Sequence, residues 1–258
     1  MAKDPLAERR RFLRRGLGAA AGLALGGCDM LSERESVTGA FEGVERLTMA
    51  AQRALLGRDA LAREFTEAEI SKAFRANGSI NPPDAGYRAL AREGFAGWRL
   101  AVDGLVERPL ALSLAELRGM PARTQITRHD CVEGWSCIGK WKGVPLAMLL
   151  ERARLRPQAR YVVFHCADVM DEKEGAPYYE SIDLVDAFHP QTILAYEMNG
   201  RPLPVEYGAP ARMRVERQLG YKMAKYVMRI EAVESFAALG EGKGGYWEDR
   251  GYEWYAGI

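Results

Sequence analysis

Thr127-Arg128-His129-Asp130-Cys131-Val132-Glu133-Gly134-Trp135-Ser136 carries a strand-like run directly into a loop. The loop holds one cysteine, Cys131, among groups that favour a tight turn and a polar environment. A thiolate in a preorganised loop suits a soft or redox-active metal, or a covalent nucleophile. A buried structural thiol is the remaining interpretation. The function of the chain therefore depends on what Cys131 holds.

The N-terminus resembles an export signal. Arg9-Arg10-Arg11-Phe12-Leu13-Arg14 is a twin-arginine pattern, and an apolar run of 12 residues follows from Gly16 to Gly27. A membrane-spanning helix needs roughly 20 residues, so this run is too short to be an anchor. A basic amphipathic helix fits poorly, because the charges form a block before the apolar run. We expect export to the periplasm by the twin-arginine machinery, which carries folded proteins that often hold a cofactor already.

The end of this signal resembles a lipoprotein cleavage site. Leu25-Gly26-Gly27 precedes Cys28, which would carry the lipid, and Asp29 would favour retention at the inner membrane. A free cysteine near an ordinary cleavage site is the alternative, and the sequence leaves both open.

Charge and length narrow the functional class. Without residues 1–27 the chain has 30 Lys and Arg against 33 Asp and Glu, a net charge near −3. A general role in binding nucleic acid or an anionic membrane is therefore not expected. The remaining length suits one domain of ordinary size, or one domain with a small appendage.

The cysteine count points to a bound or buried thiol. If Cys28 carries a lipid, Cys131, Cys137 and Cys166 remain, an odd number in an oxidising compartment. At least one of them is expected to bind metal or to be buried. One disulfide is possible, and the sequence does not choose the pair.

Periodicity and turn signals predict many short elements. Residues 29–40 are expected to be a polar linker and residues 41–75 helical, with Thr66 and Glu69 as a capping box. The alternation from Trp98 predicts a hairpin at Asp103-Gly104, and short helices are expected after Ser113, Pro145 and Asp183. Further strands are expected over Gln125–His129, Tyr161–Phe164, Thr192–Met198 (turning at Asn199-Gly200), Arg212–Val215 and Tyr226–Val233, with the tail from Gly240 packed over the surface. This pattern favours an α+β fold with mixed or antiparallel sheets over a regular βαβ fold.

Three segments then occur in order. The first is Cys131–Ser136 with Trp141–Leu146, and the second is Leu194–Gly200 with Leu203-Pro204. The third runs from Gly208–Arg212 through Gly220–Tyr226 to Arg229-Ile230. Together, over roughly residues 75–236, they resemble the molybdopterin-binding domain of the sulfite oxidase family. The resemblance implies an oxidoreductase domain over 76–236. The residues outside it predict a signal over 1–27, a linker with N-terminal helices over 28–75, and a tail over 237–258 packed on that domain.

The resemblance implies that Cys131 is the protein ligand of molybdenum held by one molybdopterin. Such a centre transfers an oxygen atom together with two electrons. A coordinated thiol is deprotonated by its metal, so Cys131 would be a thiolate.

The resemblance also implies residues that hold the cofactor. Arg can meet a phosphate through two parallel hydrogen bonds, and Lys supplies a point charge. Solvated surface charges, and a turn asparagine before Gly78, are the alternatives. The expected contacts are Asn77, Asn81, Arg212, Met223, Ala224 and Lys225, with Met223 and Ala224 acting through their backbone.

Departures from the family leave the substrate open. Tyr196 matches a substrate-side tyrosine whose phenol could donate a hydrogen bond, or it is a core aromatic. Tyr207 and Cys166 stand at positions near the cofactor where other members carry other residues. The residues after Cys131 are closer to a bacterial periplasmic branch that includes the catalytic subunit of methionine sulfoxide reductase. No arginine cluster for sulfite is identifiable.

A zinc site is the rival constellation. His129 with Cys131 and His165 with Cys166 would make a tetrahedral site if the two pairs met in space, although the spacing is not a recognised zinc pattern. His189, before Pro190, is expected to be a loop residue.

The expected protein is a monomeric, periplasm-facing molybdenum oxidoreductase. Only 23 residues follow Ser235, too few for an Ig-like domain of around 100, and no haem motif is visible. Electrons would therefore pass to or from a separate cytochrome. The reaction would be oxidation of a sulfite-like oxyanion or, alternatively, reduction of a sulfoxide or other S- or N-oxide. A non-catalytic lipoprotein binding module on the same fold is the alternative from a different class.

Overall fold

The computed structural model describes residues 35–170 and 175–258, with side chains from residue 44 onward. By its internal contacts the chain divides into two units, residues 1–54 and 55–258. The export signal and Cys28 lie outside the described residues. In the part of the chain that the structure describes, no helix has the length and apolar character that crossing a membrane requires.

Helix α2 (Glu35–Leu56) corrects two predictions. Residues 35–40, expected to be a linker, are helical, and the helix stops before Gly57, whose φ of +72° is the left-handed conformation typical of a helix end. Beyond it the chain is mostly irregular up to α3 (Ala85–Arg92). The Glu69 carboxylate accepts from the backbone N–H and the hydroxyl of Thr66, as the capping box predicts, but it supports only one 3₁₀ turn, η1 (Glu67–Glu69).

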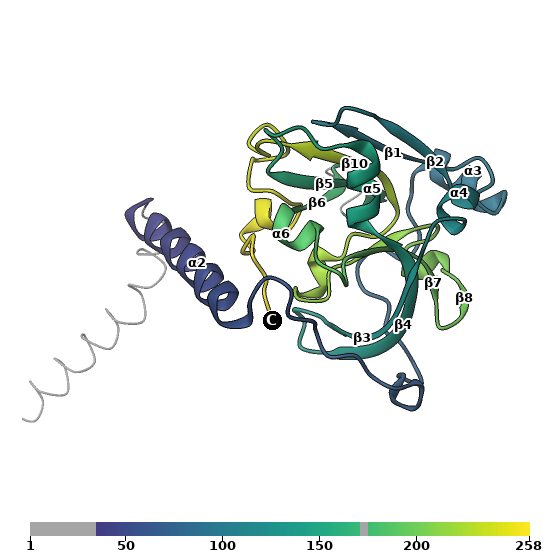
Figure 1. Cartoon of the computed structure of the whole chain (residues 1–258), viewed down its shortest axis with the longest axis horizontal. Helices are drawn as coiled ribbons and strands as arrows, with labels where there is room; N and C mark the ends of the chain where they lie inside the picture. Colours follow the sequence, from purple (N-terminus) through teal and green to yellow (C-terminus); the bar gives the residue numbers. More distant parts are fainter. Residues whose placement is uncertain (1–34, 171–174) are drawn as a thin grey trace, which may run out of the picture. The chain divides into compact units, whose positions relative to one another are not determined.

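The second unit contains two five-stranded sheets in its described residues, which Figure 1 shows as an upper and a lower group of strands. The first sheet has the order β2-β1-β10-β5-β6, and its strands β1 and β10 are parallel while the other neighbours are antiparallel. Its strands are β1 (Arg99–Gly104), β2 (Leu110–Ser113), β5 (Tyr161–Val169), β6 (Pro177–Asp183) and β10 (Val227–Val233). The mixed sheet confirms the predicted α+β class.

The second sheet is antiparallel and carries the cysteine loop. Its strands are β3 (Arg123–Asp130), β4 (Ser136–Pro145), β7 (Ile193–Met198), β8 (Arg201–Pro202) and β9 (Arg212–Arg214). β3 and β4 pair up to Asp130 and Ser136, so Cys131 opens the loop of this long hairpin. Cys131 N–H donates to Trp135 O at 2.9 Å and Gly134 N–H donates to Cys131 O at 3.0 Å, which closes the loop tightly.

Short helices begin where their caps predict. Ser113 and Asp183 accept from backbone N–H groups of the helices that follow them, and Pro145 directly precedes α5. The short helices are α3 (Ala85–Arg92), α4 (Leu114–Arg118), α5 (Leu146–Ala153) and α6 (Leu184–Ala187), with 3₁₀ turns η2 (Val205–Tyr207), η3 (Gly220–Lys222) and η4 (Glu248–Arg250).

The C-terminal tail is more than a surface cover. Tyr246 and Glu248 are buried, and the Nζ of Lys222, in η3, lies 2.5 Å from carboxylate oxygens of both Glu180 and Glu248. One buried ammonium thus joins the first sheet, the segment around η3 and the tail.

Candidate active site

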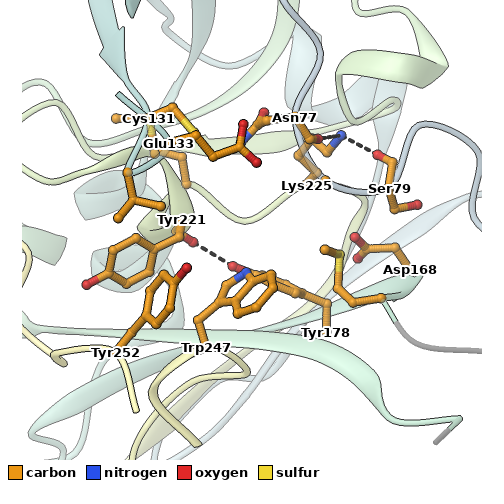
Figure 2. A pocket seen from close by; sticks show the side chains of 15 residues that line it. Asn77, Ser79, Cys131, Glu133, Asp168, Tyr178, Tyr221, Lys225, Trp247 and Tyr252 are labelled. Carbon is orange, nitrogen blue, oxygen red and sulfur yellow. Dashed lines mark hydrogen bonds between the residues drawn. The ribbon is translucent and has the colours of Figure 1, made fainter. Parts of the chain in front are cut away.

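A cavity of about 250 Å³ opens beside the thiol of Cys131. Segments far apart in the chain meet there: the loop after Arg75, the cysteine loop, the end of β5, the segment from Gly220 and the C-terminal tail (Figure 2). The residues that line it include Asn77, Ser79, Cys131, Glu133, Asp168, Tyr221, Met223, Lys225, Trp247 and Tyr252.

Cys131 is a half-buried free thiol. Burial raises its pKa, and the Glu133 carboxylate adds to this, whereas backbone N–H groups of the loop and the Arg75 guanidinium act in the opposite direction. A thiol in this setting stays protonated unless a positive centre binds it, and a metal cation does so. Cys137 and Cys166 are also free thiols, both buried, so the disulfide that the sequence left open does not form among these three residues.

Lys225 organises the polar end of the cavity. Its Nζ donates to the carbonyl oxygens of Asn77 at 2.7 Å and Glu206 at 3.1 Å, and also to that of Ser79 (Figure 2). Burial, together with the nearby Arg212, lowers the pKa of Lys225 to about 7, against the opposing effect of Asp168. The amine thus shapes the loop at Asn77 and is close to its titration point at neutral pH.

Asp168 is a cavity residue that the sequence reasoning missed. It is 3% exposed, and its Oδ1 has no hydrogen-bond partner among the described residues. Burial raises its pKa to about 7, against the attraction of Lys225. The alternation of Cys166 and Asp168 on β5 was the available signal, because it places both side chains on one face of the strand. A buried carboxyl with a strongly shifted pKa in a cleft is a candidate functional group.

Arg212 stands behind the cavity wall and does not line it. Its guanidinium donates to Tyr207 O at 3.1 Å and Met223 O at 3.3 Å, and its Nε has no partner among the described residues. Burial and the neighbouring Arg214 lower the pKa of Arg212 to about 9. Ala224 is buried, and its carbonyl oxygen accepts from Met213 N–H at 2.8 Å. The predicted segment of residues 223–225 is therefore held in place from behind.

Other predicted site residues lie away from this cavity. Tyr196 is buried in the main core with no hydrogen-bond partner for its hydroxyl among the described residues, and Asn81 lines a separate open cleft. Tyr207 donates to Phe74 O at 2.7 Å, and Cys166 is buried in the core. The structure brings Asn77, Cys131, Met223 and Lys225 together; the roles of Tyr196, Asn81, Tyr207 and Cys166 stay predictions.

The zinc alternative finds no support. No group of three potential metal-binding His, Cys, Asp or Glu side chains occurs in the described ranges. His129 is on β3 and accepts a hydrogen bond from Arg214 at 3.1 Å through Nδ1, because a guanidinium can only donate. His165 is on β5, in the other sheet, and contacts Glu231 at 2.8 Å.

The donor set fits a molybdopterin. Cys131 offers sulfur for the metal, Lys225 fixes the loop at Asn77 through backbone carbonyls, and the free Oδ1 of Asp168 offers an acceptor for the N–H groups of a pterin ring. Gly220 also forms part of the cavity wall. A Cβ there would lie 2.5 Å from the His129 ring, so only glycine lets the backbone pass this close to His129.

Residues 89–238 match the family described as "Oxidoreductase molybdopterin binding domain". The chain belongs to this family. Its members are molybdopterin-dependent oxidoreductases, so the predicted family, fold and enzyme class are confirmed for this molybdopterin-binding chain.

Two named relatives and one solved structure are similar to all or part of this chain. A protein of Azospira oryzae named "Putative protein-methionine-sulfoxide reductase subunit YedZ1" is 37% identical over 98% of this chain and 88% of its own length. "Protein-methionine-sulfoxide reductase catalytic subunit MsrP" of Xanthomonas campestris is 39% identical, with 53% of this chain matching 45% of that protein. The sulfane dehydrogenase SoxCD structure from Paracoccus pantotrophus aligns with a TM-score of 0.49 and 25% identity over 54% of this chain and 39% of that chain.

Proposed function

We propose that the chain is the molybdenum-binding subunit of a reductase that removes the oxygen atom from methionine sulfoxide in proteins. The relative that covers almost the whole chain, and the MsrP relatives that cover about half of it, carry names with this activity. The observation that carries the proposal is the character of the cavity beside Cys131.

The cavity suits a neutral substrate better than an anion. Its lining includes the carboxyl groups of Glu133 and Asp168, and the one Lys or Arg among the described lining residues is Lys225. The Nζ of Lys225 is directed at three backbone carbonyls. A sulfite-like anion would meet carboxylates here without a free cation to balance it, whereas a sulfoxide has no net charge. The predicted alternative of sulfoxide reduction is therefore the stronger one.

The chemistry needs a two-electron donor and two protons. Bound at Cys131, the molybdenum centre would supply the two electrons and accept the oxygen atom. Overall, a sulfoxide, two electrons and two protons give a thioether and water. Near neutral pH, the Asp168 carboxyl and the Lys225 ammonium are each close to their titration points, so they can hold and release protons at the polar end of the cavity.

The source of the electrons and the cellular location are inferred from the sequence. We infer export through the twin-arginine pathway to the periplasm, with Cys28 as a lipid anchor at the inner membrane. A separate cytochrome would supply electrons, and the names of the relatives, which call them subunits, support a partner protein.

Metal content is the first test. The full chain, matured in a host that makes molybdopterin, should contain about one molybdenum atom per chain, and Cys131→Ala should lose it. Stoichiometric zinc, or well-folded wild-type protein without metal, would contradict the proposal.

Substrate and direction are tested separately. The loaded protein should oxidise reduced viologen when a methionine sulfoxide peptide is added. Ferricyanide reduction driven by sulfite, without any sulfoxide-dependent oxidation of viologen, would show that the enzyme oxidises a sulfite-like anion instead.

A further inference from the structure

Three aromatic side chains form one wall of the cysteine cavity, here called the aromatic wall: Tyr221, Trp247 and Tyr252. Trp247 and Tyr252 stack with ring centroids 5.2 Å apart and 25° between their planes. Tyr221 meets Tyr252 edge-on at 5.2 Å. Figure 2 shows this wall across the cavity from Lys225 and Asn77. The cavity thus has a polar end and an aromatic side.

The two sides differ in their access to solvent. Asp168 and Lys225 at the polar end are 3% and 7% exposed, whereas Val132 and Tyr252 are 47% and 37% exposed. Val132, Tyr221 and Tyr252 also line a second, open cleft of about 410 Å³ that continues along residues 251–253 and 255–257. A molecule that arrives from solvent therefore passes the aromatic wall before it reaches the buried polar end.

The wall is held firmly. Glu248, next to Trp247, is bonded to the buried Lys222, and the following Asp249 accepts from the Tyr179 hydroxyl at 2.7 Å. The Arg250 guanidinium lies 3.7 Å from the centre of the Tyr246 ring. These contacts fix the turn between the two rings, so little conformational entropy would be lost when a ligand binds against them.

We propose that the aromatic wall is the substrate-recognition surface for a peptide-borne sulfoxide, with the open cleft receiving the flanking residues of the peptide. The wall matches the apolar chain and the sulfur of that substrate, because sulfur and methylene groups pack favourably against aromatic rings. This inference rests on the proposed function and names the residues that give it substrate specificity.

The test compares two substrates on the molybdenum-loaded full chain. Tyr252→Ala should raise KM for a methionine sulfoxide peptide about three- to tenfold. The KM for dimethyl sulfoxide, which lacks the methylene chain and the peptide, should change by about twofold or less. The ratio of kcat/KM between the substrates does not depend on how much enzyme is loaded, so a folding defect does not mimic this shift. Tyr252→Phe retains the ring and should keep the wild-type ratio. The ratio for Trp247→Phe should lie between those of the wild type and Tyr252→Ala.

Trp254→Phe is the matched control. Trp254 belongs to the same tail but stacks on Phe236 at 5.8 Å, and it lines neither the cavity nor the open cleft. The substrate ratio in this variant should equal that of the wild type. Peptide binding to the oxidised enzyme, measured by calorimetry, should weaken in Tyr252→Ala by the same factor as KM.

Two failures are distinguishable. If the loaded wild type neither binds nor reduces the peptide, the proposed function falls. If the wild type reduces the peptide and Tyr252→Ala and Trp247→Phe keep both its substrate ratio and its affinity, the aromatic wall has no role in recognition and the inference is overturned. Loss of molybdenum from Tyr252→Ala while the ratio stays constant would also overturn it, because the wall would then serve the cofactor.

Discussion

Replacing Lys222 by methionine should destabilise the second unit strongly. Lys222 and Glu180 are fully buried and Glu248 is 1% exposed, so the change removes the one ammonium that faces two buried carboxyl groups. Removing one partner of a buried ion pair costs about 3–5 kcal/mol, because the remaining charge is left uncompensated. For a unit of this size, that free energy of unfolding corresponds to a fall in Tm of roughly 6–20 °C.

The pH dependence of this loss tests its cause. Burial, with the repulsion of Glu248, raises the pKa of Glu180 well above its usual range. A carboxyl whose folded pKa is raised favours folding at low pH, and that contribution is lost as pH rises above its unfolded pKa. Without Lys222 this effect should grow, so Lys222→Met should lose much more stability at about pH 7 than at about pH 4.

Urea unfolding followed by circular dichroism at the two pH values measures the loss of stability and its dependence on pH. Lys142→Met is the control, because the ion pair between Lys142 and Glu197 is partly exposed and spans 3.4 Å; its loss should be below about 1 kcal/mol. A loss below about 1 kcal/mol for Lys222→Met, or an equal loss at both pH values, would refute the electrostatic reasoning.

Three further changes test the site. Gly220→Ala should cost about 1–3 kcal/mol in urea unfolding, because its Cβ would lie 2.5 Å from the ring of His129; an unchanged stability would mean that the wall can move aside. With the pKa of Asp168 raised to about 7 in the folded state, the cofactor-free protein should lose stability through this group as pH rises from about 4 to about 7, and Asp168→Asn should flatten that slope in denaturation at several pH values. The hydroxyl of Tyr196 is buried without a partner in the described chain and outside the cavity, so Tyr196→Phe should leave the sulfoxide KM within about twofold; a large rise in KM would restore the substrate-side role that its sequence position predicts.

The sequence predicted well those elements that are defined by a cap or a turn close by in the chain. The caps at Ser113 and Asp183 and the turn at Asn199-Gly200 each lie within a few residues of the element they define, and each is present in the structure. The predicted helix over residues 41–75 was wrong beyond Leu56. There the backbone N–H groups of Phe65 and Ser71 donate to Ile126 and Ile138 on the β3–β4 hairpin, and such long-range pairing overrides helical periodicity.

The site was predictable only in part for the same reason. Cys131 and Lys225 belong to local motifs that resemble a known family, and both line the cavity. Asp168 lies in no such motif, and Trp247 and Tyr252 lie in a tail whose glycines and aromatics carry no periodic signal. Their position depends on the buried contact between Lys222 and Glu248, which joins residues that no local pattern relates.

The contribution of the tail to the cavity has a consequence for biosynthesis. Trp247 is made more than a hundred residues after Cys131, which takes the ribosome about 6–23 seconds at usual bacterial rates. During most of that interval the nascent chain carries the thiol without Lys222 and Lys225, because both are made only shortly before Trp247. Throughout it the chain lacks Trp247, Tyr252 and Glu248, one of the two acids that contact Lys222. Cofactor loading therefore has to follow translation of the tail, and a prematurely terminated chain would present Cys131 without a finished cavity to enclose the metal.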